Sequence, residues 1–429
     1  MRRLCTPTLA LLTTLASLAC ITACKGNSAV DTLPADGGDD TPDAAVALPC
    51  GPGGVSKGPW VLAVDGTNAK IRWESCVAGT AASVSVTPEV GGAGSKFDAV
   101  ETATVVTEQT ITPLAADFPD PAGTFYMHEA TLTGLSRSTC YHYALAADAS
   151  YTGRFCTARA PGDALRFMAI GDTNPTLNDN TKKVLAQVLP KNPDFVLHGG
   201  DIQYYASGIE TWSGWFRIMQ PMLAKAGFFP AIGNHESEKP GEYQQYTLRF
   251  FHDAGFDGTP AYYRFESGGV WFFSIDTEQS VAPGTEQGTW LVSSLQDAAQ
   301  KPGYRFSIVY FHKPFVTCGD TGDDPTAFAY YGPIFKTYKV PLVFQAHMHG
   351  YERFAFDGIT YVTTAGGGGI IADPNQNKAR SYCDKRVASG NFYHAMILDI
   401  ASAAAGGAIS GQAIDRDGTV RDTFQIAAP

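Results

Sequence analysis

The chain of 429 residues lacks an excess of basic residues. It carries 31 Lys and Arg against 42 Asp and Glu, which gives a formal net charge of −11. This charge argues against a surface that binds nucleic acid. It does not exclude a small anionic substrate, because bound cations can supply positive charge locally. The length and the aromatic content of 12% allow two or three domains with a large core.

The N-terminus lacks an apolar run long enough to cross a bilayer as a helix. Arg2 and Arg3 precede an apolar segment, residues 9–18, whose length is typical of an export signal. The next stretch, Ile21-Thr22-Ala23-Cys24, resembles a bacterial lipobox. We therefore expect residues 1–23 to be a lipoprotein signal peptide and Cys24 to anchor an exported protein in the bacterial cell envelope, at the periplasmic side or the surface. Simple secretion after cleavage nearby is the alternative.

Residues 25–49 almost lack large apolar side chains. They are rich in Asp, Ala, Gly and Pro, as in "DGGDDTPDAA", and such a composition cannot bury a core. We expect residues 24–54 to be a disordered acidic linker between the membrane anchor and the folded part.

Cysteine is scarce, at nine residues. Cys5 and Cys20 leave with the signal peptide and Cys24 takes the lipid, so six of the nine remain: Cys50, Cys76, Cys140, Cys156, Cys318 and Cys383. An even set in an exported protein predicts disulfides, and six cysteines allow about fifteen pairings. Since four precede residue 160 and two follow it, we expect Cys318 to pair with Cys383 and the other four to pair among themselves in an undetermined order. Free buried thiols are the alternative.

Residues 55–160 consist of short alternating or β-branched segments separated by Gly, Pro, Asn and Asp. Seven of them are predicted strands: 59–66, 69–76, 82–89, 102–108, 126–135, 139–147 and 153–158. About seven short strands in about 100 residues are typical of an all-β sandwich of the fibronectin or immunoglobulin type. Four aromatic residues are expected in its core: Trp60, Trp73, Tyr141 and Tyr143. His128 and His142 lie on its strands, and we expect them to be structural.

Residues 161–429 alternate between strand and helix patterns. The predicted helices are 178–189, 212–226, 288–300 and 331–338. The predicted strands between them are 165–172, 193–201, 227–236, 270–278, 305–314, 340–349 and 359–369. Alternation of this kind predicts an α/β domain with at least partly parallel sheets. Three further strands, 393–400, 407–415 and 419–427, are expected to close the domain as antiparallel neighbours.

Histidine is also scarce, at nine residues, yet two stand close together in "FQAHMHGYER", directly after a predicted strand. Five predicted strands end in groups that bind metals: Asp172, Asp201, Asn234 with His235, His312, and His347 with His349. Ligands of open α/β sheets bind at the carboxyl ends of the strands. Chance explains five such ends poorly, so we expect them to meet at one metal site. The flanking Gly171, Gly200 and Gly233 permit tight turns there.

The ordered blocks "GDTN", "GDIQY", "GNHE", "VYFH" and "AHMHGYER" resemble the five-block signature of metallophosphoesterases. The Tyr after "GDIQ" and the H-x-H-x-Y-E-R ending are similar to those of the purple acid phosphatases, which also carry an N-terminal fibronectin-like domain. The resemblance covers about residues 55–425. It implies a fibronectin type III-like domain over 55–160 and, over 161–429, a metallophosphoesterase domain of two packed mixed β-sheets flanked by helices.

The resemblance also implies a binuclear metal centre. Its first metal, Fe(III), would be held by four residues: Asp172, Asp201, Tyr204 and His349. Its second, a divalent Zn, Fe or Mn ion, would be held by Asp201, Asn234, His312 and His347, with Asp201 as the bridge. Carboxylates with a phenolate are a hard ligand set, whereas imidazoles with an amide suit a divalent ion. Taken singly, Asp172 and Asp201 are equally well explained as turn residues and Tyr204 as a core residue.

Other positions take roles from the same resemblance. His235 corresponds to a histidine that contacts the substrate phosphate and is, with Asp201, the expected catalytic residue; Asn234 and Asn174 are expected to help bind substrate. Asn174 stands where the family has Gly, and Ala346 is a second small departure from its pattern. Residues 366–369 resemble the family's glycine-rich turn. We expect His198 to be a core residue or a neighbour of the site, and His252 and His394 to be structural.

The segment after His312 departs from the family pattern, because residues 313–332 contain no histidine to protonate the leaving group. Five residues are candidates to replace it: Asp320, Asp323, Tyr330, Tyr331 and His235, the last acting alone. An already good leaving group would need no acid, so diesters and activated esters stay open.

The sequence therefore predicts an exported, lipid-anchored two-metal phosphohydrolase that releases phosphate from small phosphate monoesters by attack of a metal-bound hydroxide. A phosphodiesterase on the same metal site is one alternative, and a non-catalytic envelope binding lipoprotein is another. The sequence leaves open the natural substrate, the second metal and the oligomeric state.

Overall fold

The computed structural model describes residues 50–106, 122–204, 211–237, 247–251 and 257–429. The chain divides into two units, Met1–Val46 and Ala47–Pro429. The first unit, with the predicted signal peptide and Cys24, lies outside the described residues, as do His252 and most of the predicted linker. Among the residues that are described, no helix is both long and apolar enough to span a bilayer.

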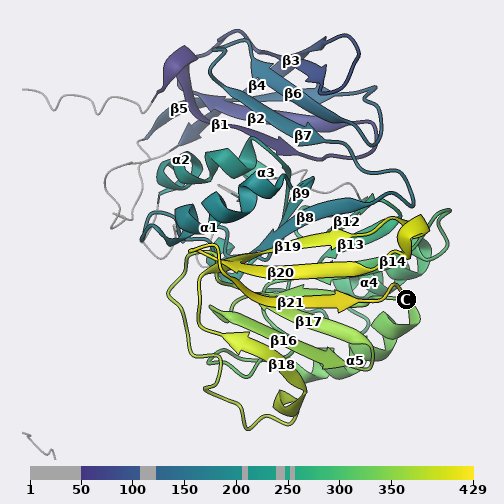
Figure 1. The fold of residues 1–429 in the computed structure, drawn as a ribbon. Coiled ribbons are helices and arrows are strands. Elements are labelled where there is room, and N and C mark those ends of the chain that lie inside the picture. The colour runs from purple at the N-terminus through teal and green to yellow at the C-terminus, as the bar shows by residue number, and fades with distance from the viewer. Residues whose placement is uncertain (1–49, 107–121, 205–210, 238–246, 252–256) are drawn as a thin grey trace, which may run out of the picture. The chain divides into compact units, whose positions relative to one another are not determined.

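The first seven strands form an all-β region (Figure 1). They are β1 (Val55–Leu62), β2 (Ala69–Ser75), β3 (Ser83–Pro88), β4 (Ser95–Val106), β5 (Gly123–Leu132), β6 (Cys140–Leu145) and β7 (Thr152–Cys156). They pair antiparallel in the order β1-β2-β5-β4-β3-β6-β7. The prediction of an all-β region is confirmed, whereas its fibronectin-like character stays a prediction.

The expected aromatic residues fill the interior of this region. Trp60 and Trp73 are fully buried, and Tyr141 and Tyr143 are nearly so. The His128 ring stacks on Trp73 with ring centroids 4.9 Å apart, and its Nε2 lies 2.8 Å from Ser75 Oγ. Burial lowers the pKa of His128, so its ring is neutral in this packing.

Three disulfides cross-link the described part of the chain. Cys318 pairs with Cys383, as predicted. The other four cysteines pair among themselves, Cys50 with Cys76 and Cys140 with Cys156. The last of these joins the adjacent strands β6 and β7, where the two cysteines are direct register partners.

The rest of the chain forms two mixed sheets. One has the order β10-β9-β8-β19-β20-β21, and its strands are β8 (Leu165–Ile170), β9 (Phe195–His198), β10 (Gly227–Pro230), β19 (His394–Ile400), β20 (Ile409–Asp415) and β21 (Val420–Ile426). The other has the order β11-β12-β13-β14-β15-β17-β16-β18. Its strands are β11 (Asp257–Gly258), β12 (Tyr263–Ser267), β13 (Val270–Ser274), β14 (Phe306–Tyr310), β15 (Leu342–Gln345), β16 (Tyr351–Phe356), β17 (Ile359–Thr364) and β18 (Arg386–Gly390).

Phenylalanines join the two sheets face to face. Phe167 on β8 contacts Phe272 on β13 and Phe344 on β15, with centroids 5.4 and 6.2 Å apart. Phe195 on β9 contacts Phe265 on β12 at 5.4 Å. Strands buried on both faces carry near-continuous apolar runs, and β14, "FSIVY", is buried at every position.

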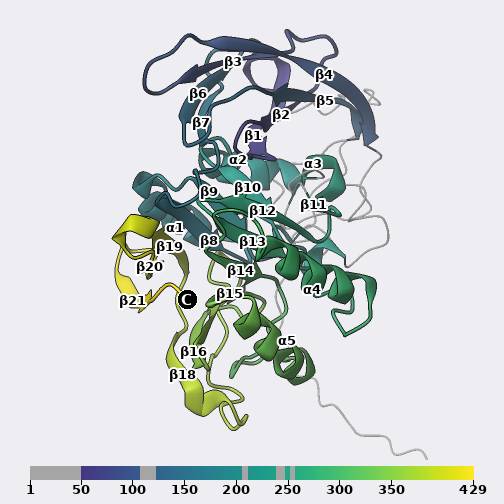
Figure 2. The ribbon, with the colours of Figure 1, turned by 90° about the vertical axis from the view of Figure 1, so that its right-hand side faces the viewer.

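Helices pack against both sheets and against the all-β region (Figures 1 and 2). They are α1 (Asn180–Val188), α2 (Trp212–Leu223), α3 (Arg249–Phe251), α4 (Glu286–Ala298) and α5 (Pro325–Thr337). α4 and α5 pack on the eight-stranded sheet through residues such as Leu295 and Phe335, while α1 contacts β19 and β20. α5 begins earlier than predicted because Asp324 caps it by accepting from Ala327 N, and Pro325 occupies its first turn.

The all-β region and the α/β region share one hydrophobic core. Trp60 on β1 packs on Phe216 of α2, with centroids 4.8 Å apart, and its indole donates to the Phe250 carbonyl at 3.0 Å. Buried Glu74 on β2 accepts from Lys57 at 2.8 Å and also pairs with Arg249 of α3. An ion pair and aromatic packing therefore fasten the two regions together.

Candidate metal centre

The predicted ligands lie just beyond the carboxyl ends of five strands. Asp172 follows β8, Asp201 follows β9 and Asn234 follows β10, and these three strands are parallel neighbours. His312 follows β14 and His347 follows β15, a parallel pair in the second sheet. Because parallel strands end at the same sheet edge, the packing of the two sheets brings both sets of ends together.

The side chains converge into two groups that share Asp201. In one group, His312 Nε2 lies 3.2 Å from Asp201 Oδ1, 3.1 Å from His347 Nδ1 and 3.1 Å from Asn234 Oδ1. In the other, His349 Nε2 lies 3.2 Å from Asp172 Oδ1 and 3.1 Å from the Tyr204 hydroxyl. The structure thus brings together all seven predicted ligands and places Asp201 between the groups.

The donor set fits metal ions better than hydrogen bonds. His312 Nδ1 faces the Gly199 carbonyl at 3.0 Å, and His349 Nδ1 faces the Ile370 carbonyl at 2.9 Å. A ring nitrogen that donates to a carbonyl leaves Nε2 with its lone pair directed into the cluster, as in metal-binding histidines. A single N–H on His312 Nε2 could serve only one of its three neighbours. Asp201 Oδ2 is buried and accepts no hydrogen bond among the described residues.

The electrostatics agree with a site built for cations. Burial acts to lower the pKa of His312, but the carboxylates of Asp201, Asp172 and Glu236 outweigh it and raise the pKa to about 10. Burial also acts to lower the pKa of His349, but the hydrogen bond and the charge of Asp172 outweigh it and raise that pKa to about 9. The surrounding carboxylates therefore favour positive charge at both rings, and metal ions that bind there would compete with protons.

The backbone is held in uncommon conformations at three ligands. Asp172, Asp201 and His347 have positive φ values of 57°, 48° and 67°. Such conformations cost energy in residues other than glycine and gather at functional sites. Gly200, at φ 90°, has no room for a side chain, since a Cβ would lie 2.9 Å from Gly233 N and from His312 Nδ1. The turn after β9 is thus shaped to bring Asp201 against His312.

The segment that carries the site is similar to a known family. Residues 165–351 match the family model described as calcineurin-like phosphoesterase. This segment is therefore similar to calcineurin-like phosphoesterases. The matched segment contains all seven of the converging side chains.

Purple acid phosphatases are among the proteins to which this chain is similar. Purple acid phosphatase 1 of Ipomoea batatas is 26% identical over an alignment of 247 positions that covers 53% of this chain and 52% of the relative. Purple acid phosphatase 13 of Arabidopsis thaliana is 25% identical over an alignment of 322 positions that covers 58% of this chain and 58% of the relative. The chain spans little more than half the length of these relatives. The purple acid phosphatase PPD1 from yellow lupin (Lupinus luteus) seeds shares the fold, with a TM-score of 0.68 and 19% identity over 86% of this chain and 74% of that one.

Glu236 is a member of the candidate site that the strand-end pattern does not predict. Its buried carboxylate accepts from the backbone N–H groups of Gly233, Asp201 and Ile202 at 2.8, 3.0 and 2.8 Å. Burial, then the charge of Asp201, raises its pKa to about 8. Glu236 therefore connects the turn after β9 to the turn after β10. Its position at the end of the "GNHE" block is the sequence signal that could have identified it.

His198 lies beside the site, in agreement with its predicted place in the core or near the ligands. Its Nε2 lies 3.0 Å from Thr173 Oγ1, and that hydroxyl donates to the Ile202 carbonyl at 2.5 Å. Burial lowers the pKa of His198 to about 3, so the ring is neutral. This chain of contacts links the loops that carry Asp172 and Asp201.

The predicted substrate residues lie at the same place. The His235 backbone N–H donates to Asp201 Oδ1 at 3.0 Å, and its Nε2 lies 3.6 Å from Asp201 Oδ2. Its ring centroid is 4.2 Å from that of Tyr204. Asn174 is buried, and its Oδ1 accepts no hydrogen bond among the described residues. Their roles toward substrate stay predictions.

The candidate acids after His312 have different surroundings. The Tyr331 hydroxyl donates to the Val281 carbonyl at 2.5 Å, and Asp323 pairs with Arg380 at 3.4 Å and with the Tyr382 hydroxyl. Asp320 is exposed. Tyr330 is half-buried in the wall of a cavity that His347 also lines.

Proposed function

We propose that the protein is a metal-dependent phosphatase that hydrolyses small phosphate monoesters. The observation that carries this proposal is the pair of ligand groups with Asp201 in common. The set of Asp172, Asp201, Tyr204 and His349 would hold Fe(III), and the set of Asp201, Asn234, His312 and His347 would hold a divalent Zn, Fe or Mn ion. When bound, such a pair would activate water and neutralise charge on phosphoryl oxygens.

The chain's own residues would hold and orient the substrate. His235 lies next to Asp201 and Tyr204, where its ring could donate a hydrogen bond to a phosphoryl oxygen. Asn234 and Asn174 would contribute amide groups at the same place. Glu236 would keep the turns that carry Asp201 and Asn234 at a fixed separation, because it accepts from both.

We further propose that the protein is exported and held in the bacterial cell envelope by lipid on Cys24. The basic start, the short apolar run and the lipobox-like residues 21–24 support this placement. Three disulfides are in keeping with an oxidising compartment. The strand order of β1–β7 supports a fibronectin type III-like module ahead of the phosphatase domain.

A phosphodiesterase on the same site is the second candidate, because residues 313–332 offer no histidine as a leaving-group acid. The protein loaded with iron and zinc should release p-nitrophenol from p-nitrophenyl phosphate at least about tenfold faster, by kcat/KM, than from bis-p-nitrophenyl phosphate. The two esters share a leaving group, so the ratio of their kcat/KM values reports whether the site prefers a phosphate with one ester bond or with two. A preference for the diester would show that the activity is that of a phosphodiesterase and not that of a monoesterase. Turnover of neither ester would favour the binding lipoprotein.

A further inference from the structure

A cavity of about 460 Å³ opens beside the metal centre. Three segments form its walls: residues 277–283 after β13, residues 313–315 after His312, and residues 322–331, which include the start of α5. His347, one of the converging ligands, also lines it. A group bound in this cavity would therefore lie next to a phosphoryl group held at the metal centre.

The first two walls are fixed to each other by the residues around Lys313. Its backbone N–H donates to Thr277 Oγ1 at 2.8 Å, and its ammonium pairs with Glu278 at 2.6 Å. The third wall is joined to the first by the Tyr331 hydroxyl, which donates to the Val281 carbonyl. The cavity is thus preformed, which lowers the entropic cost of binding.

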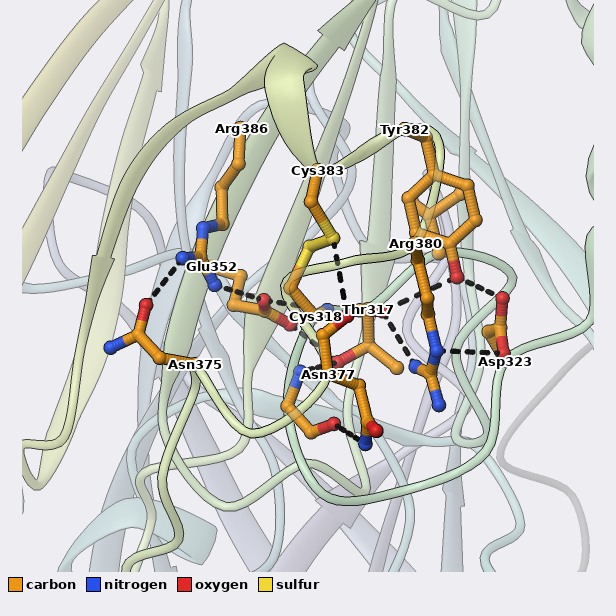
Figure 3. The surroundings of a disulfide bond; sticks show 12 residues. Thr317, Cys318, Asp323, Glu352, Asn375, Asn377, Arg380, Tyr382, Cys383 and Arg386 are labelled. Carbon is orange, nitrogen blue, oxygen red and sulfur yellow. Dashed lines mark hydrogen bonds and ion pairs between the residues drawn. A yellow bond between two sulfur atoms is a disulfide. The ribbon is translucent and has the colours of Figure 1, made fainter.

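A clamp around the Cys318–Cys383 disulfide holds the third wall from behind (Figure 3). Arg380 donates to the carbonyls of Thr317 and Thr321 at 2.7 and 3.0 Å and pairs with Asp323. Buried Glu352 accepts from Thr317 Oγ1 at 2.6 Å and from Cys318 N at 2.9 Å. The segment between His312 and α5 is therefore a fixed surface.

The charges in the cavity wall are already paired or used. Glu278 neutralises Lys313, Arg380 neutralises Asp323, and the Asp324 carboxylate accepts from Ala327 N at the start of α5. The described residues of the wall therefore have no excess of positive charge to receive a second phosphate or another strongly anionic group. Its remaining surface is largely apolar: Val281, Ala282, Pro283, Pro314, Phe315, Ala327 and Tyr330.

Tyr330 offers an aromatic face in this wall. It is half-buried and packs edge-on against Tyr331, with ring centroids 4.9 Å apart, so a neighbour that is itself hydrogen-bonded fixes its ring. Flat apolar groups bind well against such a face. A cavity of this size is at the lower end of those that take drug-sized ligands, about 300–1,000 Å³.

We propose that this cavity binds the leaving group of the substrate and selects neutral, ring-containing alcohols of more than one ring, with Tyr330 as the specificity residue. The inference rests on the proposed function, since the cavity acts on an ester held at the metal centre. Small sugar-like alcohols would bind more weakly because they make no contact with the aromatic wall. Polyphosphates would also bind more weakly, because the described residues of the wall offer them no unpaired cation.

Phenyl phosphate and 2-naphthyl phosphate test the proposal, because their leaving groups are similar in acidity and differ in ring number. The metal-loaded wild-type protein should have the higher kcat/KM for the naphthyl ester, chiefly through a lower KM. Tyr330→Ala should lower the naphthyl-to-phenyl ratio by about fivefold, the size expected for loss of one aromatic contact. Tyr330→Phe should keep the wild-type ratio. Tyr126→Ala, which removes a half-buried tyrosine from β5 of the all-β region, is the matched control and should also keep it.

A binding measurement separates the cavity from the chemistry. The wild-type protein as purified should bind 2-naphthol in a fluorescence titration, and Tyr330→Ala should weaken that binding by about the same factor. The cavity assignment alone would be overturned if Tyr330→Ala still hydrolysed phenyl phosphate but kept both the wild-type naphthyl-to-phenyl ratio of kcat/KM and the wild-type affinity for 2-naphthol. Hydrolysis of neither ester by the loaded wild-type protein would overturn the proposed function instead.

Discussion

Asp201→Asn is expected to lower phosphatase activity by at least about a thousandfold, because loss of a single preorganised transition-state contact already costs about 10²–10³ in kcat. Asp201 is the one side chain that both ligand groups contain. An amide at this position can accept the His235 N–H bond that Asp201 Oδ1 accepts now, but it cannot bridge two cations as a carboxylate does. The check is kcat/KM for p-nitrophenyl phosphate with iron and zinc supplied.

The fold of this variant should be unchanged, because asparagine tolerates the positive φ of 48° at position 201. Its circular dichroism spectrum and Tm should match those of the wild-type protein without metal. Asp399→Asn is the matched control, since Asp399 on β19 forms an exposed ion pair with Arg166 on the adjacent strand β8. Full activity in Asp201→Asn would show that no bridging carboxylate is needed and would contradict the mechanism.

Glu74→Ala is expected to lower the free energy of unfolding by about 3–5 kcal/mol, the cost of removing one partner from a buried ion pair. Glu74 is fully buried between the Lys57 ammonium and the Arg249 guanidinium. Without it, two buried cations would face each other across the junction of the all-β region and α3. Urea denaturation with the disulfides intact measures the loss.

The same residue gives the stability a dependence on pH. Burial acts to raise the pKa of Glu74, but Lys57 and Arg249 outweigh it and hold the pKa below its ordinary value of 4.5. The stabilisation is therefore present above pH 4.5 and is lost as the pH falls through the lower, folded-state pKa. Glu74→Ala should remove that part of the acid dependence.

Asp399→Ala is the control for the loss of stability, because it breaks an exposed ion pair and should lower the free energy of unfolding by no more than about 1 kcal/mol. An equally small decrease in Glu74→Ala would contradict the account of the junction.

The candidate metal centre could be predicted because its residues follow recognisable strands. β8, β9, β14 and β15 are short apolar runs that each end in a metal-binding residue, and parallel strands place those ends at one edge. The pairing of Cys318 with Cys383 followed from the distribution of cysteines along the chain. The contacts that orient the ligands, in contrast, have no repeating sequence pattern from which they could be predicted. Glu236 acts through backbone N–H groups of two separate turns, and such contacts exist only once the sheets have formed.

Two hairpins were predicted only in part, although their turns carry a local signal: β13 and β17 lie within predicted strands, whereas β12 and β16 lie outside them. β16 and β17 are joined through Asp357 and Gly358, with φ values of 46° and 86°. β12 and β13 are joined through Gly268 and Gly269, with φ values of 70° and 83°. Asp-Gly and Gly-Gly are the residues that two-residue hairpin turns require. The pairing of β19 with β8, in contrast, joins residues 394–400 to residues 165–170, and no local pattern predicts a contact over that separation.

The clamp behind the cavity wall also depends on long-range contacts. Asn377 donates to the Gly319 carbonyl at 2.6 Å, and Arg386 donates to Glu352 at 2.9 Å. The segment that supplies Asn377 and Arg380 has no strand or helix pattern from which its position could be predicted. Its place is set by side-chain hydrogen bonds and the disulfide, so the shape of the cavity became visible only in the folded chain.

Metal content per chain, measured by mass spectrometry on protein expressed with iron and zinc, tests the two-cation site most directly. The ligand geometry predicts two metal ions per chain in the wild-type protein, with visible absorption from a Tyr204 phenolate bound to Fe(III), and fewer than two in Asp201→Asn. Colourless wild-type protein with no bound metal after that treatment would contradict it.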